Sequence, residues 1–264
     1  MFRFARRSGC ALAALCVLTF AAPVAAQTAA APKPQEKPAA DLPSAQSIID
    51  RHLEAVGGRK SIASLNSVRM TAAITVPANG MTGTMEVFAA RPNKRLEKST
   101  IEGIGENKQG FDGTHAWMVT PVTGPMLHTG DELTQQRLDS NFESMLDPST
   151  RYSAMKTLEK TTFDGKEVYK VSLTRKEGGE DIDFYDVATG LKAGSINTRK
   201  SPMGSITVTS SVSEYKKFGD LLQPTRLKQS FTGVEIITTI TAIEYNKVDP
   251  AVFELPAEIK ALIK

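Results

Sequence analysis

The side chains that most often do chemistry in proteins are few in this sequence. Its three histidines, His52, His115 and His128, are widely separated and lack the ligand spacing of a zinc site. His52 falls on the apolar stripe of an expected helix, and the other two flank expected loops. The histidines are therefore interpreted as structural side chains, and the sequence predicts no metal ion.

A pair of acidic residues is the next candidate for chemistry. Asp181 and Asp183 alternate onto one face of an expected strand, with Glu180 beside them. Two carboxylates on one face could form an acid pair or bind calcium. A run of charges is more often a solvated face, so we expect a solvent-facing acidic patch without catalytic function.

Motifs of the common catalytic and nucleotide-binding sites are missing. There is no G-x-S-x-G, H-E-x-x-H, P-loop or EF-hand loop in the sequence. Gly103, Gly105 and Gly110 lack the spacing of a dinucleotide motif and are interpreted as turn and bulge residues. The sequence therefore predicts a protein without cofactor or enzymatic activity. A hydrolase on a curved sheet is the remaining enzymatic alternative.

The first 26 residues have the pattern of a secretory signal peptide. A basic start precedes an apolar run over 11–22 and small residues up to Ala26. The run is shorter than the about 20 residues that a membrane-spanning helix needs. This pattern predicts export to the periplasm. A lipoprotein signal acylated at Cys16 is the alternative, which Leu15 disfavours because that motif requires a small residue before the cysteine.

Loss of this segment would change the charge and the thiol content. The segment carries three of the 32 basic side chains, Arg3, Arg6 and Arg7. The remaining 29 basic side chains equal the 29 acidic ones in number, so the net charge would be zero. No basic stripe survives, so we expect no nucleic-acid partner. Cys10 and Cys16 also lie in this segment. The mature chain then has no thiol for a disulfide, a metal site or a nucleophile.

The rest of the chain is predicted to be an Ala- and Pro-rich flexible tether, 27–42, followed by a single domain, 43–264. Apolar residues at helical spacing predict helices over 44–56 and 130–146. Elsewhere apolar and polar residues alternate in short segments separated by turn residues. The expected strands cover 67–76, 81–90, 94–102, 105–111, 115–120, 155–163, 167–175, 180–186, 191–199, 205–217, 223–231 and 234–246.

These strands predict one wide antiparallel meander, and the twist of such a sheet makes it curl. Two helices of three to four turns cannot fill its inner face. The hollow then needs tight closure, a partner or an apolar ligand. The eight methionines that follow residue 26 favour a ligand, because flexible thioethers adapt to acyl chains. Any single methionine is better explained by ordinary core packing.

Several turns and strand ends resemble those of the LolA-like proteins, also named outer-membrane lipoprotein-sorting proteins, which are periplasmic carriers of lipoproteins. The resemblance covers about 44–256. The matching segments are Arg91-Pro92-Asn93, Gly110–Trp117 with Pro121, Leu146-Asp147-Pro148, Asp164–Tyr169, Tyr185–Leu191, Gln223–Arg226 and Val248–Phe253.

The resemblance implies a mainly β fold with a few α-helices. This fold is an unclosed antiparallel half-barrel of about 11–12 strands, with helices lidding a concave, hydrophobic face. It also implies an inner-membrane donor and an outer-membrane acceptor protein. In this family the arginine of the Arg-Pro-Asn turn bonds to the lid helices and keeps the empty pocket shut, and the matching residue here is Arg91.

We therefore expect a monomeric periplasmic protein, without a membrane span, that buries acyl chains of a lipoprotein or lipid. The lid helices, 44–56 and 130–146, would move aside to admit the chain. A sensor or interaction module of the same fold, whose inner face packs fully or binds a protein segment, is the alternative. The expected cavity residues are Ile48, Leu53, Val68, Met70, Ile74, Met85, Val87, Trp117, Leu138 and Phe142.

Overall fold

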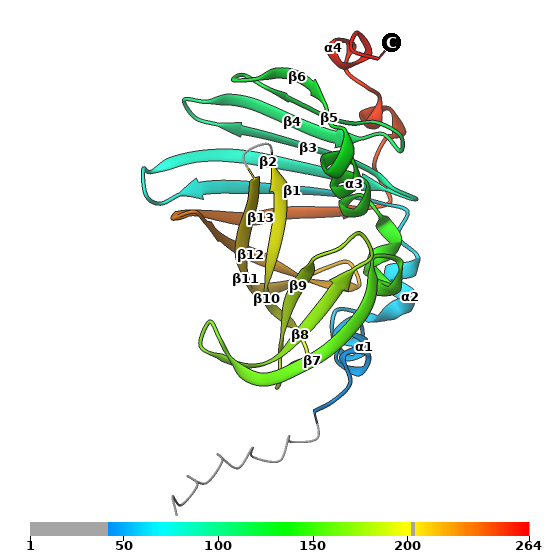
Figure 1. Ribbon diagram of the computed structural model, residues 1–264, viewed down its shortest axis with the longest axis vertical. Coiled ribbons are helices and arrows are strands. Elements are labelled where there is room, and N and C mark those ends of the chain that lie inside the picture. The colour runs from blue at the N-terminus through cyan, green and yellow to red at the C-terminus, as the bar shows by residue number, and fades with distance from the viewer. Residues whose placement is uncertain (1–41, 202–203, 264) are drawn as a thin grey trace, which may run out of the picture. The chain divides into compact units, whose positions relative to one another are not determined.

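The computed structural model describes residues 42–201 and 204–263 of the 264-residue chain. The expected signal peptide, 1–26, and all of the expected tether except Leu42 lie outside the described residues. The predicted mainly β fold is confirmed: the described part is one 13-stranded antiparallel sheet with a few short helices (Figure 1).

The elements follow the chain in a simple order. The helical segments are α1 (Ala45–Ala55), α2 (Gly58–Ala63), α3 (Gly130–Asp139), α4 (Ala257–Lys260) and the 3-10 turns η1 (Phe142–Met145), η2 (Pro148–Thr150) and η3 (Pro250–Phe253). The strands are β1 (Ser67–Val76), β2 (Met81–Ala90), β3 (Lys94–Ile101), β4 (Gly105–Phe111), β5 (Ala116–Thr120), β6 (Gly124–Leu127), β7 (Tyr152–Phe163), β8 (Lys166–Arg175), β9 (Glu180–Asp186), β10 (Lys192–Ser201), β11 (Gly204–Phe218), β12 (Leu221–Phe231) and β13 (Val234–Tyr245).

The sheet consists of two meanders joined in its middle. Its strand order is β6-β5-β4-β3-β2-β1-β13-β12-β11-β10-β9-β8-β7. Every pair is antiparallel, and the pairing of β1 with β13 joins the first strand of the chain to the last. Strands β6 and β7 form the two edges. The half-barrel is therefore unclosed, as the sequence predicts.

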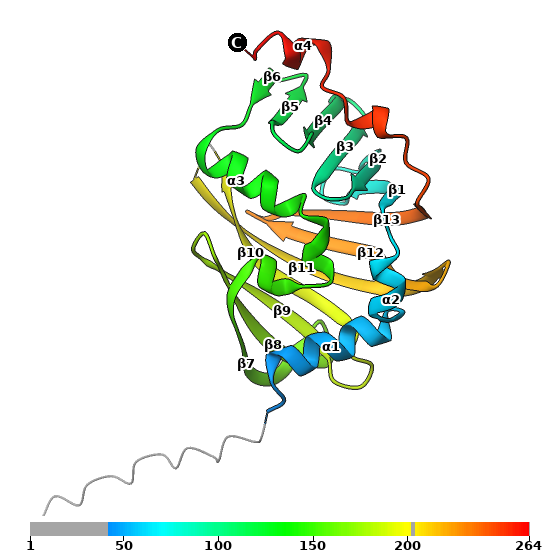
Figure 2. The ribbon, with the colours of Figure 1, turned by 90° about the vertical axis from the view of Figure 1, so that its right-hand side faces the viewer.

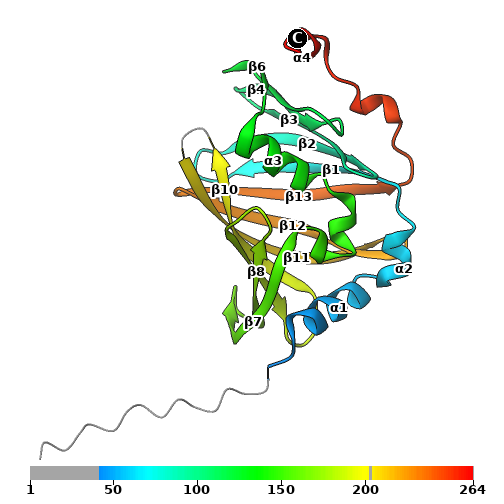
Figure 3. The same ribbon diagram turned by 45° about the vertical axis from the view of Figure 1, so that its right-hand side comes forward.

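Helix α3 reveals how strongly the sheet bends. It lies against β4 and β5 and also against β10, although seven strands separate β5 from β10 in the sheet. Eight steps of about 4.8 Å make about 38 Å of sheet, whereas the ten residues of α3 extend only about 15 Å. The sheet must therefore curve around α3, and β1 lies midway between β5 and β10 in the strand order. Figures 2 and 3 show α1, α2 and α3 on the same side of the sheet.

Two faces of the sheet are packed differently. One face, here called the helix-covered face, holds a core in which α1, α2 and η1 pack on β8 and β9. Its members include Ile48, Leu53, Phe142, Val171 and Tyr185. On the opposite, outer face, η3 and α4 cover β2 to β6, and Phe253 and Ile259 are buried there.

The expected helix over 130–146 is interrupted. Helix α3 ends at Asp139, and two 3-10 turns follow. The side chains of Asn141 and Asp147 accept hydrogen bonds from the backbone N–H groups of Glu143 and Ser149, at 3.1 and 2.9 Å. These local bonds compete with the helical ones and start new turns. Strand β6 is a thirteenth strand that the sequence did not predict, because it has only four residues and includes Pro125. Proline is tolerated in an edge strand, and β6 is one.

Candidate functional site

The register of β1 and β2 brings the predicted cavity residues of these strands to the helix-covered face. Met70 lies opposite Val87, and Ala72 lies opposite Met85. Val68, Met70 and Ile74 alternate along β1 and so share that face. Val87 and Ile74 are buried, whereas Met70 and Met85 are half-buried. Together they form an apolar strip on the central strands, between the strands that α3 contacts.

The strip continues onto β13. Ile243 lies opposite Met70, and Ile240 lies opposite Ala72 after a bulge at Thr241. Both isoleucines are half-buried. Neither is among the cavity residues that the sequence predicts, because the separation of about 170 residues between β1 and β13 leaves no local signal of their contact.

The predicted lid residues fall into two groups. Ile48 and Leu53 of α1 and Phe142 of η1 are buried in the core over β8 and β9. Leu138 of α3 is only half-buried, and none of the ten residues of α3 is buried. The structure therefore anchors α1 firmly to the sheet, while α3 contacts β4, β5 and β10 without a fully buried side chain.

Trp117 does not lie with the other predicted cavity residues. Its cross-strand neighbours Gly110 and Leu127 place it on the outer face. There it packs with Leu96 and Phe253 and is 3% exposed. The expectation that it lines the cavity is corrected, because the C-terminal segment buries it from the opposite side. Its neighbour Met118 points to the helix-covered face instead.

Arg91 connects the sheet to η1 of the expected lid and to the residues that follow α2. Its Nε donates to the carbonyl oxygen of Leu65 at 2.7 Å, directly after α2. Its guanidinium pairs with the carboxylate of Glu143 and lies over the ring of Phe142, 5.1 Å from the centroid. The backbone N–H of Phe142 also donates to Pro92 O at 3.1 Å. Arg91 therefore holds η1, which follows α3, against the end of α2.

A second network of charges lies at the same, C-terminal end of α3. Arg151 donates to Asp139, the last residue of α3, at 3.0 Å, and its guanidinium is 3.8 Å from the carboxylate of Asp181. Arg175 lies 3.3 Å from that same carboxylate, which is 1% exposed. The expectation of a solvated patch is therefore wrong for Asp181, because its side chain is buried on the helix-covered face between two arginines.

Asp183 is also buried. Its carboxylate is 2.8 Å from Lys192 Nζ and accepts a hydrogen bond from the Tyr185 hydroxyl at 3.1 Å. Burial raises the pKa of Tyr185 well above its ordinary value, so the phenol stays protonated and donates. Glu180, by contrast, is exposed, and Ser172 donates to it. The pair is thus structural, and its carboxylates already have partners.

The three histidines lie apart. His52 Nδ1 is 3.2 Å from Gly190 O, and its ring lies 5.4 Å from that of Tyr185. Burial lowers the pKa of His52 to about 4. His115 and His128 each lie near a single carboxylate, Asp112 and Glu132 respectively. Over residues 42–201 and 204–263, no group of three His, Cys, Asp or Glu side chains could hold a metal ion.

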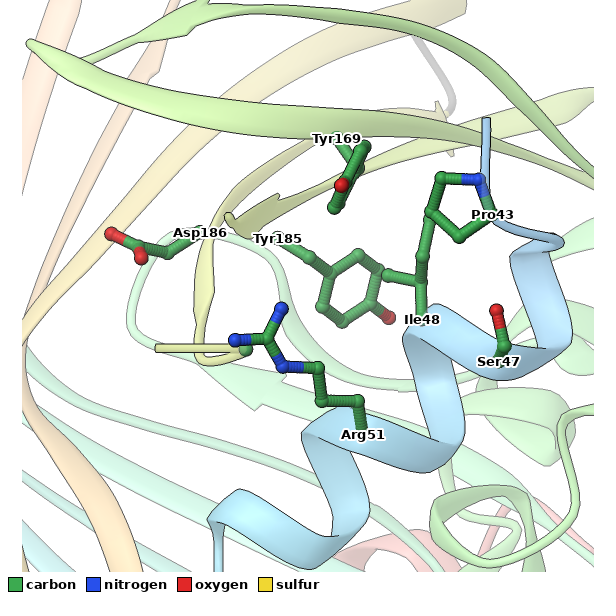
Figure 4. A pocket seen from close by; sticks show the side chains of 8 residues that line it. Pro43, Ser47, Ile48, Arg51, Tyr169, Tyr185 and Asp186 are labelled. Carbon is green, nitrogen blue, oxygen red and sulfur yellow. The ribbon is translucent and has the colours of Figure 1, made fainter. Parts of the chain in front are cut away.

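Two hollows flank the helices. One, of about 260 Å³, lies beside α1, and Figure 4 shows Tyr185 within it between Ile48 and Tyr169. Arg51 crosses it to donate to the carbonyl oxygens of Val187 and Ala188, at 2.9 and 2.7 Å. This hollow is a gap between α1 and the turn after β9.

The larger hollow, of about 480 Å³, separates α3 from the tips of the β8–β9 and β10–β11 hairpins. Leu138 lines it on the side of α3, and Arg175 and Thr198 line it on the side of the sheet. Of the predicted cavity residues, Ile48 lines the smaller hollow and Leu138 the larger one.

None of the helices within the described ranges is long and apolar enough to span a membrane. Neither a family model nor a curated protein matches this sequence.

Solved structures, in contrast, share its fold. A LolA superfamily protein from Nitrosomonas europaea is 15% identical, with a TM-score of 0.54, and the alignment covers 81% of this chain and 99% of that one. A DUF1329 family protein from Desulfovibrio piger is 12% identical, with a TM-score of 0.53, over 80% and 97% of the two chains.

A third structure, an outer membrane lipoprotein-sorting protein domain from Vibrio parahaemolyticus, is 12% identical, with a TM-score of 0.50, over 80% and 97% of the two chains. At such identities the likeness concerns the fold. The open sheet, the helices on its inner side and these matches together show that this chain has the LolA-like fold.

Proposed function

We propose that this protein is an exported carrier that buries acyl chains of a lipoprotein or lipid on its helix-covered face. Residues 1–26 would direct it to the periplasm. The observation that carries the proposal is the arch under α3. This helix bridges distant parts of the sheet and buries none of its own residues, while the apolar strip lies on the central strands between those parts.

Hydrophobic transfer supplies the driving force for such a carrier. Each methylene that moves from water into an apolar site contributes about 0.8 kcal/mol. About ten methylenes would contribute about 8 kcal/mol before the costs of ordering the chain and moving the lid. The half-buried side chains of Met70, Met85, Ile240 and Ile243 would receive the chain, and two of them are flexible methionines.

Arg91 would act as the latch of the closed state. Its bonds to Leu65 O, Glu143 and Phe142 join η1 of the lid to the segment after α2 at one point of the sheet. When α3 and η1 move aside, the contacts to Glu143 and Phe142 break. Arg91 therefore would bias the empty protein toward closure and help to expel the chain.

Binding of a fluorescent acyl probe to delipidated protein tests the proposed function. A carrier takes up the probe saturably, with unlabelled fatty acid displacing it. A sensor or interaction module with a filled interior gives no saturable uptake, and this result would refute the carrier. Native mass spectrometry of protein from its own periplasm would then identify the class of any co-purifying lipid.

The latch is tested by Arg91→Leu. We expect this variant to fold but to release or exchange its ligand poorly, because the closed state loses its bonds. Arg69→Leu is the matched control, since Arg69 lies on the outer face between Glu86 and Glu244. The measurement is the rate of probe transfer to acceptor vesicles. Normal transfer by Arg91→Leu would remove the latch role.

A further inference from the structure

The helix-covered face changes character beside the apolar strip. Glu97 and Ser99 of β3 lie opposite Val87 and Met85 of β2, so they point to the same face. Both are half-buried. A face made only for acyl chains would continue with apolar side chains at these positions.

The polar side chains extend one strand further. Gln109 and Asn107 of β4 lie opposite Glu97 and Ser99. Neighbouring strands are about 4.8 Å apart, and alternate residues along a strand are about 6.7 Å apart. The four side chains thus mark a rectangle of about 5 by 7 Å, which is the footprint of one sugar ring or a glycerol unit. We call these four residues the polar window.

Apolar side chains resume beyond the window. Gln109 lies opposite Met118 of β5, which lies opposite Met126 of β6. The window is therefore enclosed by the apolar strip on one side and by methionines on the other. Two of its four residues lie on β4, which α3 contacts together with β5.

The hydrogen-bonding groups of the window are largely unused. Ser99, Asn107 and Gln109 make no side-chain hydrogen bond with another described residue. Glu97 is neutralised by Arg95, whose Nη2 donates to its carboxylate at 2.9 Å. The window therefore offers amides, a hydroxyl and spare carboxylate lone pairs without net charge.

The far side of the same face differs in this respect. Ser195 donates to Asn197 at 3.0 Å, and Gln229 lies 3.5 Å from Ser210. These polar side chains satisfy one another. The unpaired polar side chains on β3 and β4, in contrast, favour a polar group supplied from outside the chain.

We infer that the polar window binds the headgroup of the ligand, and that this headgroup is neutral and rich in hydroxyl groups. The inference rests on the proposed carrier function. The acyl chain would lie on the strip of β13, β1 and β2, with its headgroup over β3 and β4 at the edge of α3. Hydroxyls can donate to Glu97 and to the amide oxygens and accept from the amide nitrogens, whereas a single charge finds no opposite charge that is free.

The test uses ligands that share a dodecyl chain and differ in headgroup. Dodecyl glucoside, dodecanoate and dodecyltrimethylammonium, each below its micellar concentration, displace a fluorescent acyl probe from the wild-type protein. We expect dodecyl glucoside to bind about tenfold more tightly than either ion, as two hydrogen bonds would give.

The double variant Asn107→Leu/Gln109→Leu should lose this preference and still bind the probe. Lys108→Leu, on the same strand but the outer face, is the matched control and should keep it. Equal binding of the three ligands by wild type, or preference for an ion, overturns the headgroup site while the carrier function stands. Retained preference in the double variant overturns it too.

Failure of wild type to bind any acyl probe instead refutes the carrier function and the headgroup site with it. If the double variant fails to fold, Ser99→Ala and Gln109→Glu replace it. The alanine should reduce the preference for glucoside. The glutamate should reverse it in favour of dodecyltrimethylammonium, and no change in either variant overturns the site.

Discussion

His52 is the residue whose surroundings make folding depend on pH. Burial lowers its pKa from 6.5 to about 4, so the folded state keeps it neutral while the unfolded chain protonates it near pH 6.5. Stability is therefore lost as the pH falls from 6.5 to 4, by about 3 kcal/mol at most. His52→Gln keeps a donor for Gly190 O and should lack this loss. Urea unfolding of both proteins at several pH values measures the difference, and parallel curves would contradict it.

Arg151 illustrates how burial determines the contribution of an ion pair to the free energy of unfolding. It is 12% exposed and joins Asp139 to the buried carboxylate of Asp181. Arg151→Met should destabilise the protein by about 3 kcal/mol, because it leaves these carboxylates with fewer partners. Arg59→Met removes an exposed pair with Asp50 and should cost less than about 1 kcal/mol. Denaturant unfolding compares the two variants, and equal losses would show that burial is not the cause.

At the scale of elements, the helices differ in how firmly they are held. Helix α1 has a side-chain N-cap from Ser44 and buries Ala45, Ile48, Ile49 and Leu53. Helix α3 has no side-chain cap bond and buries none of its residues. Its amides should therefore exchange with solvent far faster than those of α1, since local opening costs little where few side chains are packed. Hydrogen–deuterium exchange measures this, and equal protection of the two helices would contradict a mobile lid.

At the scale of the whole molecule, the two faces of the sheet should respond separately. Trp117 is the sole tryptophan of the chain and is buried on the outer face, beneath the C-terminal segment. An acyl chain on the helix-covered face would not touch it. A brominated fatty acid that displaces the fluorescent probe should therefore leave Trp117 emission unquenched. Strong quenching would place the ligand on the outer face instead.

The sequence by itself determined the local structure of this protein. Alternation of apolar and polar residues located twelve of the strands, and turn residues such as Asn79-Gly80 and Thr232-Gly233 located their ends, because both signals lie within a few residues. The helix over 44–56 was equally readable from its period and its glycine stop. The likeness of the turns to those of LolA-like proteins indicated the fold.

Only the tertiary structure decided which side chains face the hollow. Alternation divides a strand into two faces but does not say which one is inside, so Trp117 was assigned to the cavity in place of Met118. The burial of Asp181 likewise depends on Arg175 of β8 and on Arg151, which follows η2. The pairing of β1 with β13 brings together segments about 170 residues apart, and no local pattern in the sequence indicates it.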